Sequence, residues 1–428
     1  MIEVGCLGLC EYRSSCIDFA TVEIFIRIQG SKEVRRFTQH VSMDRMLQQS
    51  VACTSYVSLA FHEIDVWRRG LMADLRTAHH MRNRNRFGGA YFIYMLLASM
   101  LVFVGMPVGY AANGETIARV TARGMLRCGV SEGIVGFSVR SASGVWTGID
   151  VEFCRAVAAA VLGNPDKVVF VSLRASERFP ALIGGTVDLL VRNTSWTLLR
   201  ESTLGVQFAG VLFYDNQAFM VLARSAPKTL AGLRNAAVCV QKGTSSLDHL
   251  LTYSSVYRLN LQPVISDSAA QTRAAFFSGR CRVWTSDASQ LTAARQTAPG
   301  GQQNYAILPE RIAQEPLGPV VRGDDLNWLI LIRWVLDALL AAEDLGLTQA
   351  NVASRLHDAV VRTTFVTGED VDRNLGVAPG WASRAVQAVG NYGEIFDRTL
   401  GSDSTLHLER GPNRLWRDGG LMYALPIR

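Results

Sequence analysis

The sequence lacks the features that mark nucleic-acid-binding and membrane-embedded proteins. Its net charge is only +6 over 428 residues, and no block of like charges is dense enough to indicate a nucleic-acid groove. The apolar run at residues 90–104 is shorter than the roughly 20 residues that a membrane-spanning helix needs. We therefore expect the charges to lie on a solvated surface, and we expect no nucleic-acid partner.

Residues suited to metal binding are few and scattered. The eight cysteines include no Cys-x-x-Cys pair. Three histidines follow residue 112, namely His249, His357 and His407. From this pattern we expect neither a metal site nor a cofactor. A zinc site through Cys6, Cys10 and Cys16 is the alternative that the spacing leaves open.

Residues 81–112 have the three parts of a secretory signal. A basic head of three arginines precedes the uncharged apolar run at residues 90–104, and small residues follow at 109–112 (GYAA). A buried core helix would explain the apolar run, but not the basic head and the small-residue end together. The pattern predicts export to the periplasm, with cleavage after Ala111 or Ala112.

The position of this signal, far from the first residue, predicts a boundary at Met81. A secretion signal acts at the nascent N-terminus, so a folded domain in front of it would be unexpected. Residues 1–80 show no clean periodicity. We interpret them as a start-site artefact or a disordered extension, with translation beginning at Met81. A cytoplasmic extension followed by a signal-anchor is the alternative.

After residue 112 the sequence alternates strand and helix patterns. The strand patterns are short apolar runs, at residues 125–130, 168–173, 187–191, 236–241, 261–266 and 281–287. Helix patterns lie between and after them, from Asp150 as N-cap, from Ser176 as N-cap, at residues 269–279 and at residues 324–345. The alternation stops after the third strand and restarts near residue 236. Two such runs predict an α/β fold with two lobes and a cleft between them.

The chain crosses between these lobes near residues 213–219 and 307–319. We assign residues 113–214 and 310–428 to lobe 1 and residues 215–309 to lobe 2.

Four cysteines follow the signal, which is an even number in an oxidising compartment. Cys128 and Cys154 fall in lobe 1, whereas Cys239 and Cys281 fall in lobe 2. We predict one disulfide within each lobe. Four unpaired buried thiols are the alternative.

A polar turn at residues 193–195 follows the strand pattern at 187–191. Open α/β sheets bind ligands at the carboxyl ends of their strands. A helix that begins near Thr197 would direct Arg200 back over this turn, because side chains tilt toward the N-terminus of a helix. A guanidinium there can hold a carboxylate through two parallel hydrogen bonds. By this reasoning alone, an exposed surface arginine is the more ordinary interpretation.

The second lobe contains matching features. The GTSS turn at residues 243–246 lies between a strand and a helix and offers hydroxyl and N–H groups, and Asp287 ends a strand. Taken alone, Asp287 is better interpreted as the N-cap of the helix that follows. Taken together, an acid and an arginine on opposite sides of one cleft would suit a zwitterion.

Several long motifs in order make the sequence resemble a known family. They include LRCGV, WTGIDVEFCRAVAAAV, ERFPALIGGTVDLLVRNTSWTL, VCVQKGTSS, GRCRVWTSD and EPLGPVVR. About residues 116–428 resemble the periplasmic solute-binding proteins of polar amino-acid ABC transporters, and most closely those of general L-amino-acid specificity. The resemblance implies the two-lobed periplasmic-binding-protein fold of type II, with the ligand cleft between the lobes.

The resemblance also implies roles for individual residues. Arg200 matches the arginine that binds the α-carboxylate of the ligand, and Asp287 matches the acid that pairs with its α-ammonium group. Ser195 and Ser245 match residues that help to hold these groups, and Asn193 matches a polar neighbour.

An apolar pocket wall is implied at Phe179, with Trp196 close by. Many relatives stack an aromatic ring on the ligand where this sequence has Ile134, and its loss fits a permissive pocket. Arg282 replaces an acid that the family pattern would place there, which a surface position makes harmless.

The mechanism implied by the resemblance is binding without chemistry. The lobes of a monomer close over an L-amino acid, and the closed form docks on the permease subunits of an ABC transporter at the inner membrane. The alternative is a periplasmic enzyme on the same fold, dehydratase-like, acting on an amino-acid-like substrate. Such an enzyme needs an acid/base pair in the cleft, and the sequence makes only Asp287 evident.

Overall fold

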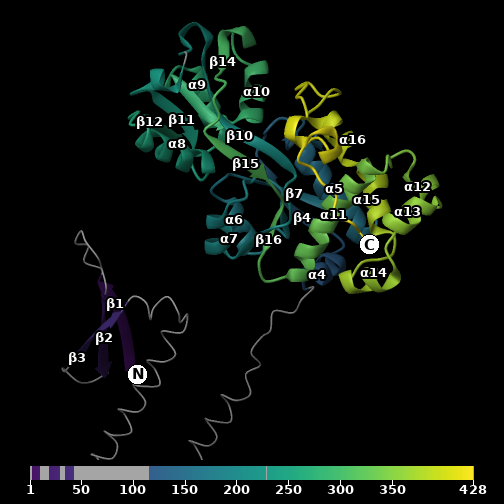
Figure 1. Cartoon of the computed structure of the whole chain (residues 1–428), viewed down its shortest axis with the longest axis horizontal. Helices are drawn as coiled ribbons and strands as arrows, with labels where there is room; N and C mark the ends of the chain where they lie inside the picture. Colours follow the sequence, from purple (N-terminus) through teal and green to yellow (C-terminus); the bar gives the residue numbers. More distant parts are fainter. Residues whose placement is uncertain (1, 10–18, 29–33, 43–114, 228, 428) are drawn as a thin grey trace, which may run out of the picture. The chain divides into compact units, whose positions relative to one another are not determined.

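The computed structural model describes residues 2–9, 19–28, 34–42, 115–227 and 229–427 (Figure 1). The chain divides into two compact units, Met1–Pro107 and Val108–Arg428. The predicted secretory signal at residues 81–112 lies outside the described residues.

Three strands make up the described part of the first unit: β1 (Ile2–Leu9), β2 (Phe19–Ile28) and β3 (Val34–Ser42). They form an antiparallel sheet in the order β1-β2-β3. This sheet was not predicted from the sequence, although β2 (FATVEIFIRI) is rich in the β-branched and aromatic residues that favour strands. The interpretation of residues 1–80 as a start-site artefact stays a prediction.

A five-stranded sheet forms the centre of lobe 1. In spatial order its strands are β7 (Val168–Leu173), β4 (Leu126–Ser131), β8 (Leu189–Leu190), β16 (Val320–Arg322) and β9 (Val206–Phe208). β4 pairs parallel with β7 and β8, whereas β16 pairs antiparallel with β8 and β9. Parallel neighbours need crossover connections, which α5 (Ile149–Leu162) and α6 (Arg178–Ile183) supply. A small hairpin of β5 (Val139–Arg140) and β6 (Trp146–Thr147) precedes α5.

A six-stranded sheet forms the centre of lobe 2. Five strands follow the spatial order β12 (Gln262–Ser266), β11 (Ala237–Gln241), β13 (Val283–Asp287), β10 (Phe213–Leu222) and β14 (Tyr305–Ile307). The sixth, β15 (Ala313–Leu317), also pairs with β10, so this strand joins the sheet of lobe 2 although the predicted boundary at residue 310 places it in lobe 1. The helices of this lobe are α8 (Ser245–Val256), α9 (Ala269–Phe277) and α10 (Ala288–Gln296).

Strands β10 and β15 connect the two lobes. They pair antiparallel over their shared length, with Phe213 opposite Leu317. At the same end, Leu317 forms an isolated bridge with Ser195 of lobe 1, and the Phe213 ring lies 5.4 Å from that of Phe137 in the core of lobe 1. β15 lies within the second predicted crossing, whereas β10 begins at the start of the first and extends three residues beyond its end.

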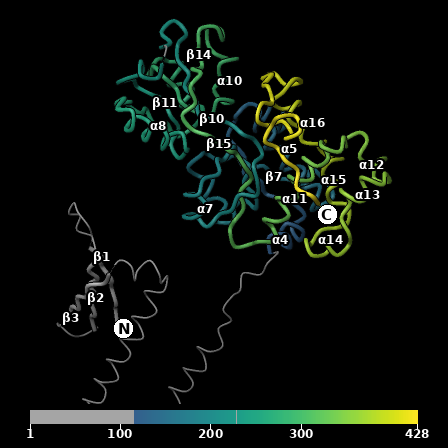
Figure 2. The backbone as a smooth tube through the Cα atoms, in the orientation of Figure 1, coloured from purple at the N-terminus to yellow at the C-terminus, as the bar shows by residue number. Residues whose placement is uncertain are grey.

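Further helices belong to lobe 1, and Figure 2 shows α5, α11 and α15 gathered in this part of the molecule. They are α4 (Glu115–Arg123), α7 (Leu198–Leu204), α11 (Leu326–Asp344), α12 (Val352–Arg355), α13 (Ala359–Thr364), α14 (Glu369–Leu375), α15 (Trp381–Val389) and α16 (Tyr392–Thr399). Short 3-10 helices lie at Ala223–Ser225, Leu230–Leu233, Gln302–Asn304, Gly411–Asn413 and Trp416–Asp418. α15 packs against both α5 and α11. Within the described residues, no helix has the length and apolar composition needed to cross a membrane.

Two predicted helix starts were wrong. The N-cap of α5 is Gly148, not Asp150, and its φ of 127° lies in the region that favours glycine. A Cβ atom on Gly148 would lie 2.1 Å from the carbonyl oxygen of Phe137, so this close passage of the chain fixes where the helix begins. α6 begins after Glu177 rather than after Ser176.

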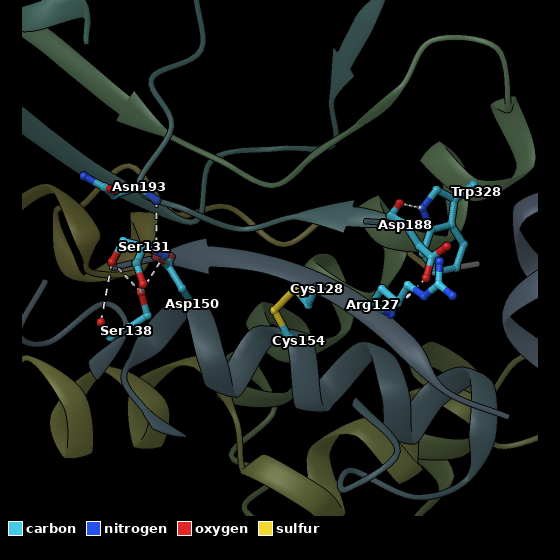
Figure 3. The surroundings of a disulfide bond; sticks show 9 residues. All are labelled: Arg127, Cys128, Ser131, Ser138, Asp150, Cys154, Asp188, Asn193 and Trp328. Atoms are coloured by element: carbon cyan, nitrogen blue, oxygen red, sulfur yellow. Dashed lines mark hydrogen bonds between the residues drawn. A yellow bond between two sulfur atoms is a disulfide. The ribbon is translucent and has the colours of Figure 1, made fainter. Parts of the chain in front are cut away.

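Both predicted disulfides are confirmed. Cys128–Cys154 joins β4 to α5 within lobe 1 (Figure 3), and Cys239–Cys281 joins β11 to the segment before β13 within lobe 2. Their Cα atoms are 6.3 Å and 5.6 Å apart. All four residues are buried, so each disulfide links a strand covalently to another segment within the core of its lobe.

Candidate functional site

Side chains from both lobes meet in the turns that follow β8 and β11 and at the end of β13. The Oγ atoms of Ser195 in lobe 1 and Ser245 in lobe 2 lie 3.0 Å apart. The side-chain amide of Asn193 donates a hydrogen bond of 3.1 Å to Oδ2 of Asp287. The predicted turns of the two lobes therefore face each other across one interface.

Asn193 is held in an uncommon backbone conformation, with φ of 35°. Its N–H donates to Oδ2 of Asp150 at 3.2 Å (Figure 3), and its side-chain Oδ1 accepts from Nη1 of Arg192 at 3.3 Å. Burial raises the pKa of Asp150 to about 7, although the Asn193 N–H and the charge of Arg192 act in the opposite direction. Asp150 therefore supports the turn that carries Asn193 instead of capping its own helix.

Arg200 reaches back over the same turn, as the tilt of helical side chains predicts. Thr197 is the N-cap of α7, and its side chain accepts from the N–H of Arg200. Nη1 of Arg200 then donates to the carbonyl oxygen of Ser195 at 2.6 Å, and its Cζ lies 5.5 Å from the centroid of the Phe179 ring. Burial lowers the pKa of Arg200, while the carboxylate of Glu315 acts most strongly against that shift.

Glu315 on β15 is a fully buried acid that the sequence analysis did not select. Ser245 Oγ lies 3.0 Å and 3.1 Å from its two carboxylate oxygens, and Nδ1 of His249 lies 3.2 Å from Oε1. The same Nδ1 lies 3.1 Å from Oε1 of Gln217, whose amide nitrogen donates to Oγ1 of Thr285. Both neighbours of Nδ1 are acceptors, so Nδ1 carries a proton.

Three acids share one face of the sheet of lobe 2. Asp215 lies opposite Glu315 in the β10–β15 register, and Gln217, two residues along, lies opposite Asp287 in the β10–β13 register. Asp215 accepts a hydrogen bond from Oγ of Ser289. Residues two apart on a strand face the same side, so these groups form one polar surface. Within the part of the chain that the structure describes, no group of three or more His, Cys, Asp or Glu side chains is arranged to hold a metal ion.

Burial, together with the proximity of these acids, sets their protonation. Burial raises the pKa of Asp287 well above its ordinary value, and the carboxylates of Glu315 and Asp215 raise it further. Burial also raises the pKa of Asp215 to about 6, against the hydrogen bonds from Ser289. Burial raises the pKa of Glu315 too, but hydrogen bonds led by that from His249 outweigh it and leave the pKa lowered. Glu315 is thus the acid that carries the charge when the three compete for it.

Aromatic residues line the lobe 1 side of the site. The Phe179 ring lies beneath both Arg200 and Arg178, whose Cζ is 5.0 Å from the ring centroid. Trp196 stacks on Phe208, with ring centroids 5.6 Å apart and planes within 5°. Phe179 and Trp196 pack against the same apolar cluster of lobe 1.

A cavity of about 380 Å³ lies between the loop at residues 132–135 and helices α9 and α10. Ile134, Phe277 and Trp284 contribute apolar lining, and Glu132 and Arg273 contribute charge. Oε1 of Glu132 accepts from the N–H of Ala269, so this contact also joins the two lobes. The residue that stands in place of a stacking aromatic therefore faces an open space.

The structure brings Asn193, Ser195, Arg200, Ser245 and Asp287 together in one interface, whereas Trp196 is engaged with Phe208. Asp287 does occupy the N-cap position of α10, but its side chain makes no capping hydrogen bond and points to Asn193 instead. Asp287 therefore has the predicted N-cap position, but the prediction that its side chain caps the helix was wrong. The assignment of these residues to a bound ligand stays a prediction.

Sequence reasoning missed five polar residues of this interface: Asp150, Arg178, Arg192, Asp215 and Glu315. All are at least 90% buried. Arg178 and Glu315 stand inside motifs that carry the family resemblance, ERFPAL and EPLG, which was the available signal.

Comparison with known proteins places this geometry in context. The family model of the bacterial extracellular solute-binding proteins, family 3, matches residues 126–350. The general L-amino acid-binding periplasmic protein AapJ of Rhizobium johnstonii is 42% identical over 338 residues, which cover 78% of this chain and 99% of the relative. The glutamate/glutamine/aspartate/asparagine-binding protein BztA of Rhodobacter capsulatus is 42% identical, with 75% and 96% covered.

A solved structure is similar over nearly the same part of the chain. An ABC transporter periplasmic binding protein from Brucella ovis, with glutathione bound, has a TM-score of 0.70 and 40% sequence identity. The similarity covers 73% of this chain and 99% of that protein.

Proposed function

The chain belongs to the bacterial extracellular solute-binding proteins of family 3, and from this premise we propose that it captures L-amino acids for an ABC importer. It is the binding subunit, it acts outside the cytoplasmic membrane, and it delivers its ligand to the permease subunits as a monomer. The relatives AapJ and BztA are named for amino-acid binding, which supports the ligand class. No catalytic step is part of this proposal.

One observation carries the ligand assignment: a guanidinium of lobe 1 and a carboxylate of lobe 2 both contact the turn at residues 193–195. Arg200 donates to the carbonyl of Ser195, Ser195 contacts Ser245, and Asp287 contacts the neighbouring Asn193. An amino acid presents a carboxylate and an ammonium group a short distance apart. The guanidinium suits the first through paired hydrogen bonds, and the carboxylate suits the second.

The same arrangement supports broad specificity. Every amino acid carries the two charged groups, and breaking a buried ion pair costs about 3–5 kcal/mol. One side-chain methylene changes discrimination by only about 1–3 kcal/mol. Isoleucine at position 134, where many relatives place a stacking aromatic ring, constrains the ligand side chain less. Affinity is therefore dominated by the groups that all ligands share.

Calorimetric titration of the purified protein with each L-amino acid tests the proposal. The protein is first stripped of ligand by unfolding and refolding. We expect micromolar binding, about −8 kcal/mol, to many chemically different amino acids. Recovery of the ligand unchanged separates a binding protein from a dehydratase-like enzyme. Binding to a single amino acid refutes broad specificity, and conversion of the ligand refutes a pure binding function.

Two substitutions test the anchors. We expect Arg200→Ala and Asp287→Ala to abolish binding of every ligand, because each removes one partner of a shared charge pair. Arg174→Ala is the matched control, since Arg174 is half-exposed and pairs only with Glu177. Loss of some ligands and not others would show that the anchors are assigned wrongly.

A further inference from the structure

Arg178 and Arg192, next to the Arg200 side chain in lobe 1, each carry a buried N–H group that has no hydrogen-bond partner. The unpaired atoms are Nε of Arg178 and Nη2 of Arg192. The residues are 2% and 1% exposed, so water does not satisfy these donors. Native proteins rarely leave buried donors unpaired, because each costs about 1–3 kcal/mol and more when the group is charged.

A third unpaired donor belongs to the facing edge of lobe 2. It is Nε2 of Gln241, which is buried at the end of β11. Two residues later, the carbonyl oxygen of Gly243 accepts a hydrogen bond of 3.1 Å from Nη2 of Arg178. The unpaired atoms here are all donors. A group of donors without acceptors indicates an anionic or carbonyl partner.

The protein's own acids do not fill this role. Among the residues that the structure describes, Arg178, Arg192 and Arg200 form no ion pair with a carboxylate. Asp287 accepts from Asn193, and Glu315 accepts from Ser245 and lies beside His249. The nearby negative charges are therefore engaged with other donors.

The pKa shifts of these arginines also indicate that a negatively charged partner is missing. Burial lowers the pKa of Arg178 well below its ordinary value, and the positive charges of Arg200 and Arg192 lower it further. Burial lowers the pKa of Arg192 to about 10. Three positive side chains are thus held close together inside the protein. A single ligand α-carboxylate at Arg200 balances only one of them.

Arg178 and Arg200 share the Phe179 ring, with Cζ atoms 5.0 Å and 5.5 Å from its centroid. These two distances keep the Cζ atoms within about 10.5 Å of each other, a span that a ligand with two carboxylates a few bonds apart can bridge. Amino acids with an acidic side chain are such ligands.

We propose that Arg178, with the unpaired donors of Arg192 and Gln241, forms a second anion subsite that binds the side-chain carboxylate of an acidic amino acid. This inference rests on the proposed function and refines it. Neutral amino acids bind through the shared α groups alone, and glutamate or aspartate gains an additional charged contact.

The test compares ligands on one protein and then on matched variants. Glutamate, glutamine and alanine are titrated by calorimetry against wild type, Arg178→Met and the control Arg174→Met, whose target is a half-exposed arginine four residues before Arg178. We expect wild type to bind glutamate more tightly than glutamine. Arg178→Met should weaken glutamate binding roughly 10- to 100-fold more than alanine binding, because alanine loses only the hydrogen bond between the lobes to Gly243, whereas glutamate also loses a charged hydrogen-bond partner. Arg174→Met should change none of the three.

Two results overturn the inference. Equal weakening of all three ligands by Arg178→Met would mean that Arg178 acts only as a latch between the lobes through Gly243. If the wild-type protein binds glutamate no more tightly than glutamine, the second anion subsite is also refuted. This comparison needs no variant, so it remains a test even if Arg178→Met does not fold. Binding of alanine and glutamine in that experiment would still support the proposed function, so the two failures are distinguishable.

Discussion

Glu315 offers the sharpest test of how the interface is held together. We predict that Glu315→Gln destabilises the protein by about 2 kcal/mol at pH 7, because hydrogen bonds to a charged group contribute about 1.5–3 kcal/mol each. The fully buried carboxylate of Glu315 accepts a hydrogen bond from Ser245 Oγ and lies 3.2 Å from Nδ1 of His249. A glutamine offers only one acceptor atom, and its amide would place a donor against one of these donors.

A partial compensation limits the size of the effect. The charge of Glu315 raises the pKa of Asp287 and of Asp215, so a neutral residue at this position relieves repulsion on both. This gain offsets the loss of one of the two charged contacts, which is why the expected change is near the lower part of the range. The lost contacts join β15 to α8, so the same variant should also weaken ligand binding through a misplaced Ser245.

The pH dependence gives the prediction its sign. The folded-state pKa of Glu315 is lowered, so its contribution is present above the unfolded-state pKa and is lost as pH falls through the lowered value. Urea unfolding at pH 7 and at several lower values should show the two proteins converging as the pH falls. Glu369→Gln, at an exposed position, is the control. A Glu315→Gln variant as stable as wild type at pH 7 would refute the reasoning.

Further predictions concern the two disulfides, the Asp150 carboxylate that supports the turn at Asn193, and the contact of Gly243 with Ser176 between the lobes. Reducing both disulfides, which close loops of 26 and 42 residues, should lower the free energy of unfolding by about 3–4 kcal/mol each, measured by urea unfolding with and without reductant. Asp150 has a folded-state pKa raised to about 7, so wild type should lose stability as pH rises from about 4 to 7, and Asp150→Asn should remove this loss in melting curves. An unchanged pH profile would count against the assigned burial effect. A Cβ on Gly243 would lie 3.0 Å from backbone atoms of Ser176 across the lobes, so Gly243→Ala should weaken all ligands in calorimetry, and selective weakening would contradict it.

The regular part of the fold could be predicted from the sequence because local patterns encode it. The strand pattern at residues 168–173 matches β7, and the predicted helix at 324–345 matches α11 to within two residues at its start and one at its end. Thr197 was expected near a helix start and caps α7. Cysteine pairing followed from placing each pair in one lobe. Local signals of capping, periodicity and composition are sufficient for all of these.

The missed residues depend on contacts between distant segments. Asp150 has the local pattern of an N-cap, but the close passage of Gly148 against Phe137 moves the helix start and frees the carboxylate for Asn193. The residues next to Glu315 in the sequence give no indication that its carboxylate contacts Ser245, which lies seventy residues earlier. Burial of a charged residue is a property of the assembled interface. A single sequence cannot show it, although both residues sit within motifs that carry the family resemblance.

The distribution of charge across the cleft explains why closure should depend on a ligand. Arg178, Arg192 and Arg200 come from lobe 1, whereas Asp287 and Glu315 come from the sheet of lobe 2. Bringing them together removes both sets from water, which costs several kcal/mol per ion unless each charge finds a partner. Protein hydrogen bonds outweigh burial for Glu315, but not for Asp287 or the three arginines, whose pKa values stay shifted toward the neutral form. On the proposed function, a zwitterion would supply an anion to one side and a cation to the other, and would bind the closed form in preference to the open one. A difference in affinity between the two forms shifts the equilibrium between them. Binding of the ligand's α-carboxylate and α-ammonium groups and closure of the lobes would therefore be thermodynamically coupled.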